Sequence, residues 1–168
     1  MDSAEQAEMS RTFTTVHELL TSGIFNQQNI SHILLKSAFI HLLISLRALM
    51  WKSDNYSKRI NFTDDVLVQG KVKDVTDLIK YVRDALCHPD SPNLRIGTTV
   101  IAPFNIYFGT GCVVQMGGVT HQPLYQDDVY FTFGGQGIYL GRHIIRAFNE
   151  ARENLLPLMD ERMRPRHL

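Results

Sequence analysis

Hydrophobic residues recur among polar ones with a helical period between Lys71 and Pro89, in the stretch KVKDVTDLIKYVRDALCHP. Apolar residues recur at gaps of three and four, which gives an amphipathic helix one apolar stripe. The stripe consists of Val72, Val75, Ile79, Val82 and Leu86. Because the residue before a proline avoids the α region, we expect this helix to end at or near His88.

Two further helical patterns precede this stretch. The first begins at residue 11 or 12 and ends at Thr21, after a polar N-terminal segment that we expect to fray. The second begins at residue 28 or 29 and ends near Trp51. Its apolar face is too broad for a helix that packs on one side only. We therefore expect it at the centre of a bundle or at a dimer interface.

The pattern changes to short strands after His88, where prolines and glycines exclude long helices. Runs rich in β-branched and aromatic residues predict strands over residues 98–101, 105–108, 112–116, 128–133 and 138–140. Gly-rich stretches between them are typical of tight turns. The glycines of residues 109–118 do not indicate a phosphate-binding loop, since no lysine-threonine pair and no helix follow them.

A helical pattern returns from about Tyr139 to Met163, and Pro157 should kink or interrupt it. Together these patterns predict a mainly α fold. We expect one domain over residues 1–168, a helical bundle with a small antiparallel β element over residues 97–140. That element is inserted between the third and the last long helices.

The charges are balanced, with 17 basic and 17 acidic residues. No global field would therefore attract nucleic acid, and any RNA site must be local. Cys87 and Cys112 are too few for a disulfide framework and indicate reduced thiols in a cytoplasmic protein. The N-terminus has no signal-peptide pattern, and no apolar run is long enough to span a membrane, so we expect no membrane contact.

Candidate chemistry gathers at the end of the helix predicted over residues 71–88. Asp84 and His88 are four residues apart, so on a helix their side chains are neighbours. A carboxylate can hold one imidazole nitrogen and leave the other free to move a proton. Arg83 adds a cation whose forked donors suit a phosphate. The alternative is an ordinary solvated helix end, because such residues are also compatible with the helix dipole.

The segment Arg83-Asp84-Ala85-Leu86-Cys87-His88 resembles the R-x(4–6)-H motif of the HEPN superfamily. The resemblance rests on Arg83 and His88, and Asp84 stands at the position where a polar residue commonly follows the arginine. It implies a small helical bundle and a homodimer in which two motifs form one composite active site. HEPN toxins paired with a nucleotidyltransferase antitoxin often have a Tyr two positions after the His, where this chain has Asp90.

The resemblance implies a metal-independent endoribonuclease in toxin–antitoxin, antiphage or RNA-processing biology. The attack of a ribose 2′-hydroxyl would leave 2′,3′-cyclic phosphate ends, and a regulatory protein or antitoxin would be a possible partner. Two alternatives stay open. One is a non-catalytic HEPN-like module that binds RNA, a nucleotide or a partner protein. The other is a structural homo-oligomeric domain with an accidental Arg-His spacing.

Basic residues elsewhere are weaker candidates for RNA binding. Arg142, His143 and Arg146 share one side near the start of the last helix, where anions are favoured. Lys58 and Arg59 form a small basic pair that would suit a phosphate backbone, although such groups are more often just solvated. No His, Cys or carboxylate spacing indicates a metal site, and we expect no cofactor.

Overall fold

A computed structural model describes residues 1–88, 90–97 and 100–166. The chain divides into two compact units. We call Met1–Ile60 with Ile145–Leu168 the helical unit, and Asn61–Ile144 the mixed unit. The predicted combination of helices with a small antiparallel β element is confirmed, but the chain is mixed α/β rather than a purely helical bundle.

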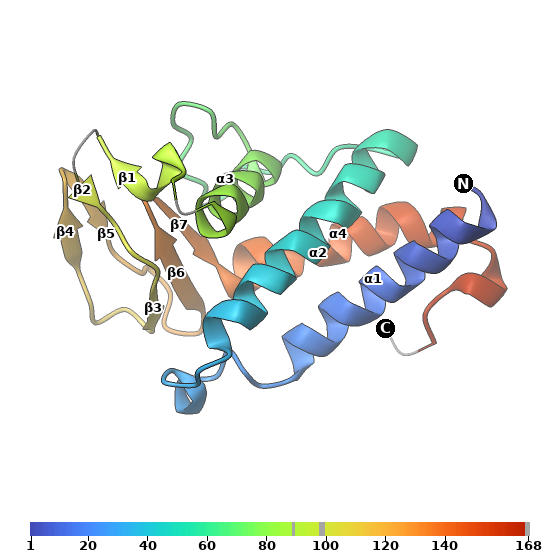
Figure 1. Cartoon of the computed structure of the whole chain (residues 1–168), viewed down its shortest axis with the longest axis horizontal. Helices are drawn as coiled ribbons and strands as arrows, with labels where there is room; N and C mark the ends of the chain where they lie inside the picture. The colour runs from blue at the N-terminus through green and yellow to red at the C-terminus, as the bar shows by residue number, and fades with distance from the viewer. Residues whose placement is uncertain (89, 98–99, 167–168) are drawn as a thin grey trace. The chain divides into compact units, whose positions relative to one another are not determined.

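The helical unit contains α1 (Ser3–Thr21), α2 (Leu35–Tyr56) and α4 (Arg146–Leu155). Helix α2 lies beside both α1 and α4 (Figure 1). The rings of Phe13 and Phe148 join α1 to α4, with their centroids 6.0 Å apart. Apolar side chains that are buried in this unit include Met9, Val16, Phe39, Leu42, Leu46, Leu49, Ala151 and Leu155. Buried apolar stripes of this kind stabilise helices far more than propensity does.

Helix α1 begins eight residues or more before the predicted start, so the expected fraying is wrong. Asp2 and Glu5 form a capping box: the Asp2 carboxylate accepts the Glu5 N–H at 2.8 Å, and the Glu5 carboxylate accepts the Asp2 N–H at 3.0 Å. Two N–H groups that would lack helical partners are thereby satisfied. The Tyr56 hydroxyl at the end of α2 also donates to Glu5, at 2.8 Å. Hydrogen bonds of polar side chains thus stabilise the N-terminal end of α1.

The bounds of the other two helices of this unit also differ from the prediction. A 3₁₀ turn over Gln27–Asn29 precedes α2, which starts only at Leu35 and runs past Trp51 to Tyr56. Helix α4 ends at Leu155 and is followed by 3₁₀ turns over Leu156–Leu158 and 161–163. Pro157 lies in the first of these turns, and it ends the helix because it cannot donate a backbone hydrogen bond.

The mixed unit contains α3 (Val75–Cys87) and the strands β1 (Arg95–Ile96), β2 (Val100–Ile101), β3 (Asn105–Phe108), β4 (Val114–Met116), β5 (Val119–His121), β6 (Val129–Phe133) and β7 (Gln136–Tyr139). β3, β6 and β7 form an antiparallel sheet in the order β3-β6-β7. β1 pairs with β2 and β4 with β5, both antiparallel. The start of the strand predicted over residues 98–101 lies outside the described residues.

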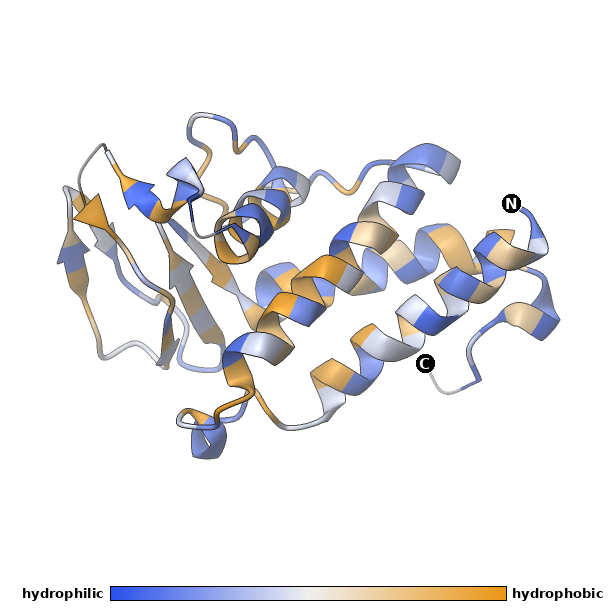
Figure 2. Cartoon of the chain, in the orientation of Figure 1, coloured by the Kyte–Doolittle hydropathy of each residue, from blue (hydrophilic) through white to orange (hydrophobic). Residues whose placement is uncertain are grey.

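Helix α3 packs against β6 and β7. Its buried side chains are Val75, Thr76, Leu78, Ile79, Val82 and Ala85, and the facing strands bury Phe131, Phe133 and Ile138. Figure 2 shows hydrophobic and hydrophilic residues on different sides of α3, as its period predicts. A π-helix follows β7 over Leu140–Ile145.

Candidate functional site

The C-terminal end of α3 carries the three residues of the R-x(4–6)-H motif. At its start, the Asp74 carboxylate accepts the Asp77 N–H at 2.9 Å and caps the helix. Val72 lies before the helix, in a turn in which Gln69 and Val72 exchange backbone hydrogen bonds. The last helical residue is Cys87, and His88 is extended at φ −121° and ψ 102°. This is the conformation expected before a proline; Pro89 itself lies outside the described residues.

Arg83 and Asp84 form an ion pair with each other. The Asp84 Oδ1 accepts from Arg83 Nε at 2.9 Å and also from Arg83 Nη2. Both side chains are partly buried, with 33% of Arg83 and 28% of Asp84 exposed. Both donors share this one oxygen, so the contact differs from the bidentate pair in which a guanidinium contacts both oxygens of a carboxylate. Asp84 therefore holds the Arg83 guanidinium in place.

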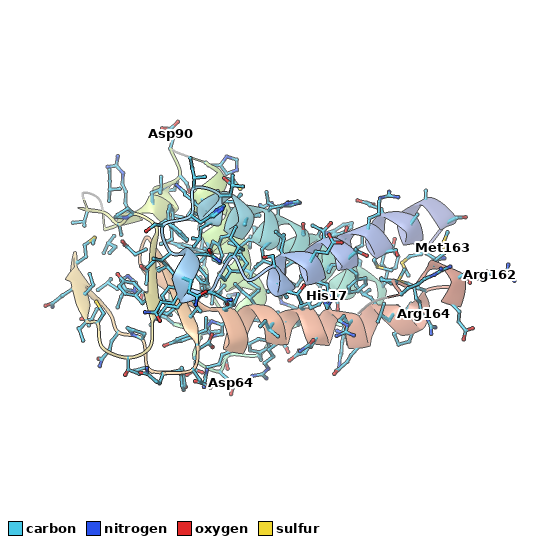
Figure 3. All side chains as sticks on the ribbon, turned by 90° about the horizontal axis from the view of Figure 1, so that it is seen from below. His17, Asp64, Asp90, Arg162, Met163 and Arg164 are labelled. Atoms are coloured by element: carbon cyan, nitrogen blue, oxygen red, sulfur yellow. The ribbon has the colours of Figure 1, made fainter. Side chains whose placement is uncertain are left out.

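His88 is exposed, and its backbone N–H donates to the Asp84 carbonyl at 3.2 Å. Its imidazole makes no hydrogen bond or ion pair with any residue that the structure describes. The expected side-chain contact between Asp84 and His88 is not formed, because His88 has left the helical conformation. Asp90, two residues further on, is exposed and projects outward in Figure 3.

A cavity of about 160 Å³ lies beside this motif, and Asp84 is part of its wall. The other lining residues are Lys71, Asp77, Lys80, Tyr81 and Asn93. The Tyr81 hydroxyl donates to the Asn93 carbonyl at 3.2 Å. Burial raises the pKa of Tyr81, which keeps its phenol a neutral donor. The sequence analysis missed this cavity, although residues 77, 80, 81 and 84 have the spacing of one helix face.

His143 is fully buried in the mixed unit, away from any surface that RNA would contact. Its Nδ1 accepts the Tyr139 N–H at 3.0 Å, and its Nε2 lies 3.1 Å from the Asp64 carbonyl oxygen. The first contact requires an unprotonated Nδ1, so Nε2 carries the proton and donates. Both ring nitrogens are thus used in the protein. Sequence spacing alone placed His143 among the RNA-binding candidates.

Arg142 is held by acidic residues of the mixed unit. Its guanidinium contacts Asp128 at 3.0 Å and Asp127 at 3.2 Å, and lies over the Tyr125 ring, 3.4 Å from the centroid. Side chains that compensate the arginine charge and cover one face of its guanidinium leave it less available to a phosphate. Arg142 is 31% exposed in this position.

The remaining basic candidates belong to the helical unit. Arg146 begins α4, and its Nε donates to Glu150 at 3.2 Å. Arg59 pairs with Asp54 at 3.6 Å. Lys58 is exposed, and its carbonyl accepts the Ser53 hydroxyl at 2.7 Å. Each arginine therefore has an acidic partner at the surface, and exposed ion pairs of this kind contribute little to stability.

Within residues 1–88, 90–97 and 100–166, no group of three or more His, Cys, Asp or Glu side chains is arranged to hold a metal ion. In the same part of the chain, every helix is too short or too polar to cross a lipid bilayer. No family model, curated protein or solved structure matches the sequence.

Proposed function

We propose that the chain is a metal-independent endoribonuclease of HEPN type whose site is the end of α3. The observation that carries the proposal is the position of Arg83, Asp84 and His88 at one helix end, with the imidazole exposed and without a protein partner among the described residues. The adjoining cavity adds Lys71 and Lys80, whose ammonium groups can contact phosphates of an RNA strand, and its wall also includes the carboxylates of Asp77 and Asp84.

In this mechanism the ribose 2′-oxygen attacks the neighbouring phosphorus while the bond from phosphorus to the 5′-oxygen breaks. His88 takes the 2′-hydroxyl proton or protonates the leaving oxygen. Arg83 stabilises the charge that develops on the phosphoryl oxygens. Asp84 positions the guanidinium, since it is the group that holds it in the structure. The products are a 2′,3′-cyclic phosphate and a free 5′-hydroxyl.

This chemistry uses both a proton acceptor and a proton donor, and each chain places one histidine at the site. A homodimer that joins two motifs would supply both, so we propose that RNA cleavage depends on a second copy. An antitoxin or another regulatory protein would then act by covering the motif or by separating the copies.

The test is cleavage of labelled mixed-sequence RNA in EDTA by the wild type, His88→Ala and Arg83→Ala. Loss of general acid–base catalysis should lower the rate about 10²–10⁴-fold in His88→Ala. His41→Ala is the matched control, because His41 is an exposed histidine of α2. The products should carry cyclic phosphate ends, and a strand with 2′-deoxyribose should stay intact. Undiminished cleavage by His88→Ala would refute the assignment.

One observation favours the non-catalytic alternative. The Arg83 guanidinium is already paired with Asp84, which reduces the positive charge offered to a scissile phosphate. In that case the protein would bind RNA, a nucleotide or a partner protein without turnover. RNA binding that saturates in the same EDTA buffer, with no cleavage by the wild type, would support this function instead.

A further inference from the structure

A second cavity lies in the helical unit, where α4 ends. Its volume is about 710 Å³, which is within the range of small-molecule sites. All of its lining residues belong to the last part of the chain: Asn149, Arg152, Glu153, Leu156, Pro157 and Arg164. Two guanidinium groups therefore line one cavity, with a single carboxylate beside them.

Arg152 has a buried donor that no described residue uses. Its Nη1 is 3.5 Å from the Asn149 Oδ1, and its guanidinium carbon lies 5.8 Å from the centroid of the Phe148 ring. The Nε atom is buried and has no hydrogen-bond partner among the described residues. A buried donor without a partner is uncommon in a native structure, and it leaves this guanidinium one hydrogen bond short.

Arg164 is fixed in place by the backbone. Its Nε and Nη2 donate to the Met159 carbonyl at 3.3 and 3.2 Å. Its Nη1 makes no hydrogen bond within residues 1–88, 90–97 and 100–166. The side chain is only partly exposed, whereas Arg162 on the same segment is exposed; both are labelled in Figure 3. An arginine that is held at one edge offers its other edge at low entropic cost.

We propose that this cavity binds a phosphate monoester of nucleotide size. Guanidinium groups bind phosphate through paired N–H donors. Arginines from two separate segments suit a tetrahedral anion with three terminal oxygens better than a planar carboxylate with two. Leu156 and Pro157 offer an apolar wall for the organic part of the ligand, and Glu153 offers an acceptor for its hydroxyl or amino groups. This inference does not depend on ribonuclease activity.

The test is calorimetric titration of the full chain with AMP, with adenosine and with acetate. AMP should bind with a Kd of about 1 mM or tighter. Adenosine and acetate should each have a Kd at least about tenfold higher. Each lacks the phosphate, and one charge-assisted hydrogen bond to phosphate changes the affinity about tenfold or more. Arg152→Lys keeps the charge but removes the paired N–H donors of the guanidinium, and Arg164→Gln removes the second cation. Each should weaken AMP binding about tenfold or more.

Arg162→Gln is the matched control, since it removes an exposed cation from the same segment, and His88→Ala is the control for the α3 site. Both should bind AMP as the wild type does. Circular dichroism and thermal unfolding identify variants that fold, and Arg164→Gln still tests the site if Arg152→Lys does not fold. Wild-type affinity in a folded Arg152→Lys or Arg164→Gln variant would overturn the proposal. Equal binding of adenosine or acetate would do the same.

Discussion

The buried carboxylate of Asp128 joins the start of β6 to the start of the π-helix over Leu140–Ile145. It accepts the N–H groups of Val129 at 2.8 Å, Gly141 at 2.7 Å and Arg142 at 3.0 Å. The Arg142 Nη1 adds a fourth hydrogen bond at 3.0 Å. Only 4% of the Asp128 side chain is exposed. We therefore expect Asp128→Ala to destabilise the mixed unit strongly.

The size of the effect follows from the groups that lose a partner. Each buried donor without an acceptor costs about 1–3 kcal/mol, although water can reach some of them. Arg142 keeps Asp127 and the Tyr125 ring. The cost therefore comes mainly from the three backbone N–H groups that lose their acceptor, and we expect about 3 kcal/mol or more for Asp128→Ala. Asp127 also contacts Arg142, but 77% of its side chain is exposed, so Asp127→Ala should cost about 0–1 kcal/mol.

Urea unfolding followed by circular dichroism measures both changes in the free energy of unfolding. Amide hydrogen exchange gives a local measure, because the Gly141 and Arg142 N–H groups should lose protection in Asp128→Ala and keep it in Asp127→Ala. If the two alanine variants unfold at the same urea concentration, the Asp128 contacts do not stabilise the mixed unit.

Two further predictions concern the mixed unit. Gly134→Ala should destabilise the mixed unit by about 2 kcal/mol or more, measured by urea unfolding. Gly134 has φ +58°, and an added Cβ would meet the Asn93 carbonyl oxygen. Gly111→Ala is the control and should be neutral, because a Cβ there meets no atom within 4 Å. Burial lowers the pKa of His121 from 6.5, so the unfolded chain takes up a proton at a higher pH than the folded chain does. Stability should therefore fall as the pH drops below about 6.5, and His121→Gln should flatten this dependence in unfolding curves measured from pH 8 to pH 5.

The helical period of the stretch from Lys71 to Pro89 predicted α3, but it did not predict that α3 packs against β6 and β7. Val75, Ile79 and Val82 are buried as the stripe requires. The helix starts three residues after Val72, because the turn with Gln69 uses the Val72 N–H and Asp74 provides the cap. The period of apolar residues indicates which face of a helix is buried, but it does not determine the residue at which the helix begins.

Long-range partners explain why sequence spacing did not show what the basic residues near Leu140 contact. His143 contacts the Asp64 carbonyl, which lies 79 residues earlier in the chain. Arg142 is paired with Asp127 and Asp128, which precede β6. Local spacing places such residues on one side of a helix, whereas the pairing of β6 with β7 determines which groups meet them. Only the three-dimensional arrangement reveals that they hold the fold together.

The Arg83–Asp84 ion pair limits how well a single chain could bind the phosphate of an RNA substrate. Spacing places Arg83 and His88 at one helix end, but the nearest anion to the guanidinium is the neighbouring carboxylate. Arg83 and Asp84 contribute no net charge together, so a phosphate must compete with Asp84 for the same donors. That competition becomes favourable when further cations surround the phosphate. In the adjoining cavity the positive charges of Lys71 and Lys80 are matched by the carboxylates of Asp77 and Asp84. A single chain therefore provides no excess of positive charge there, and the ribonuclease proposal requires a second copy of the chain.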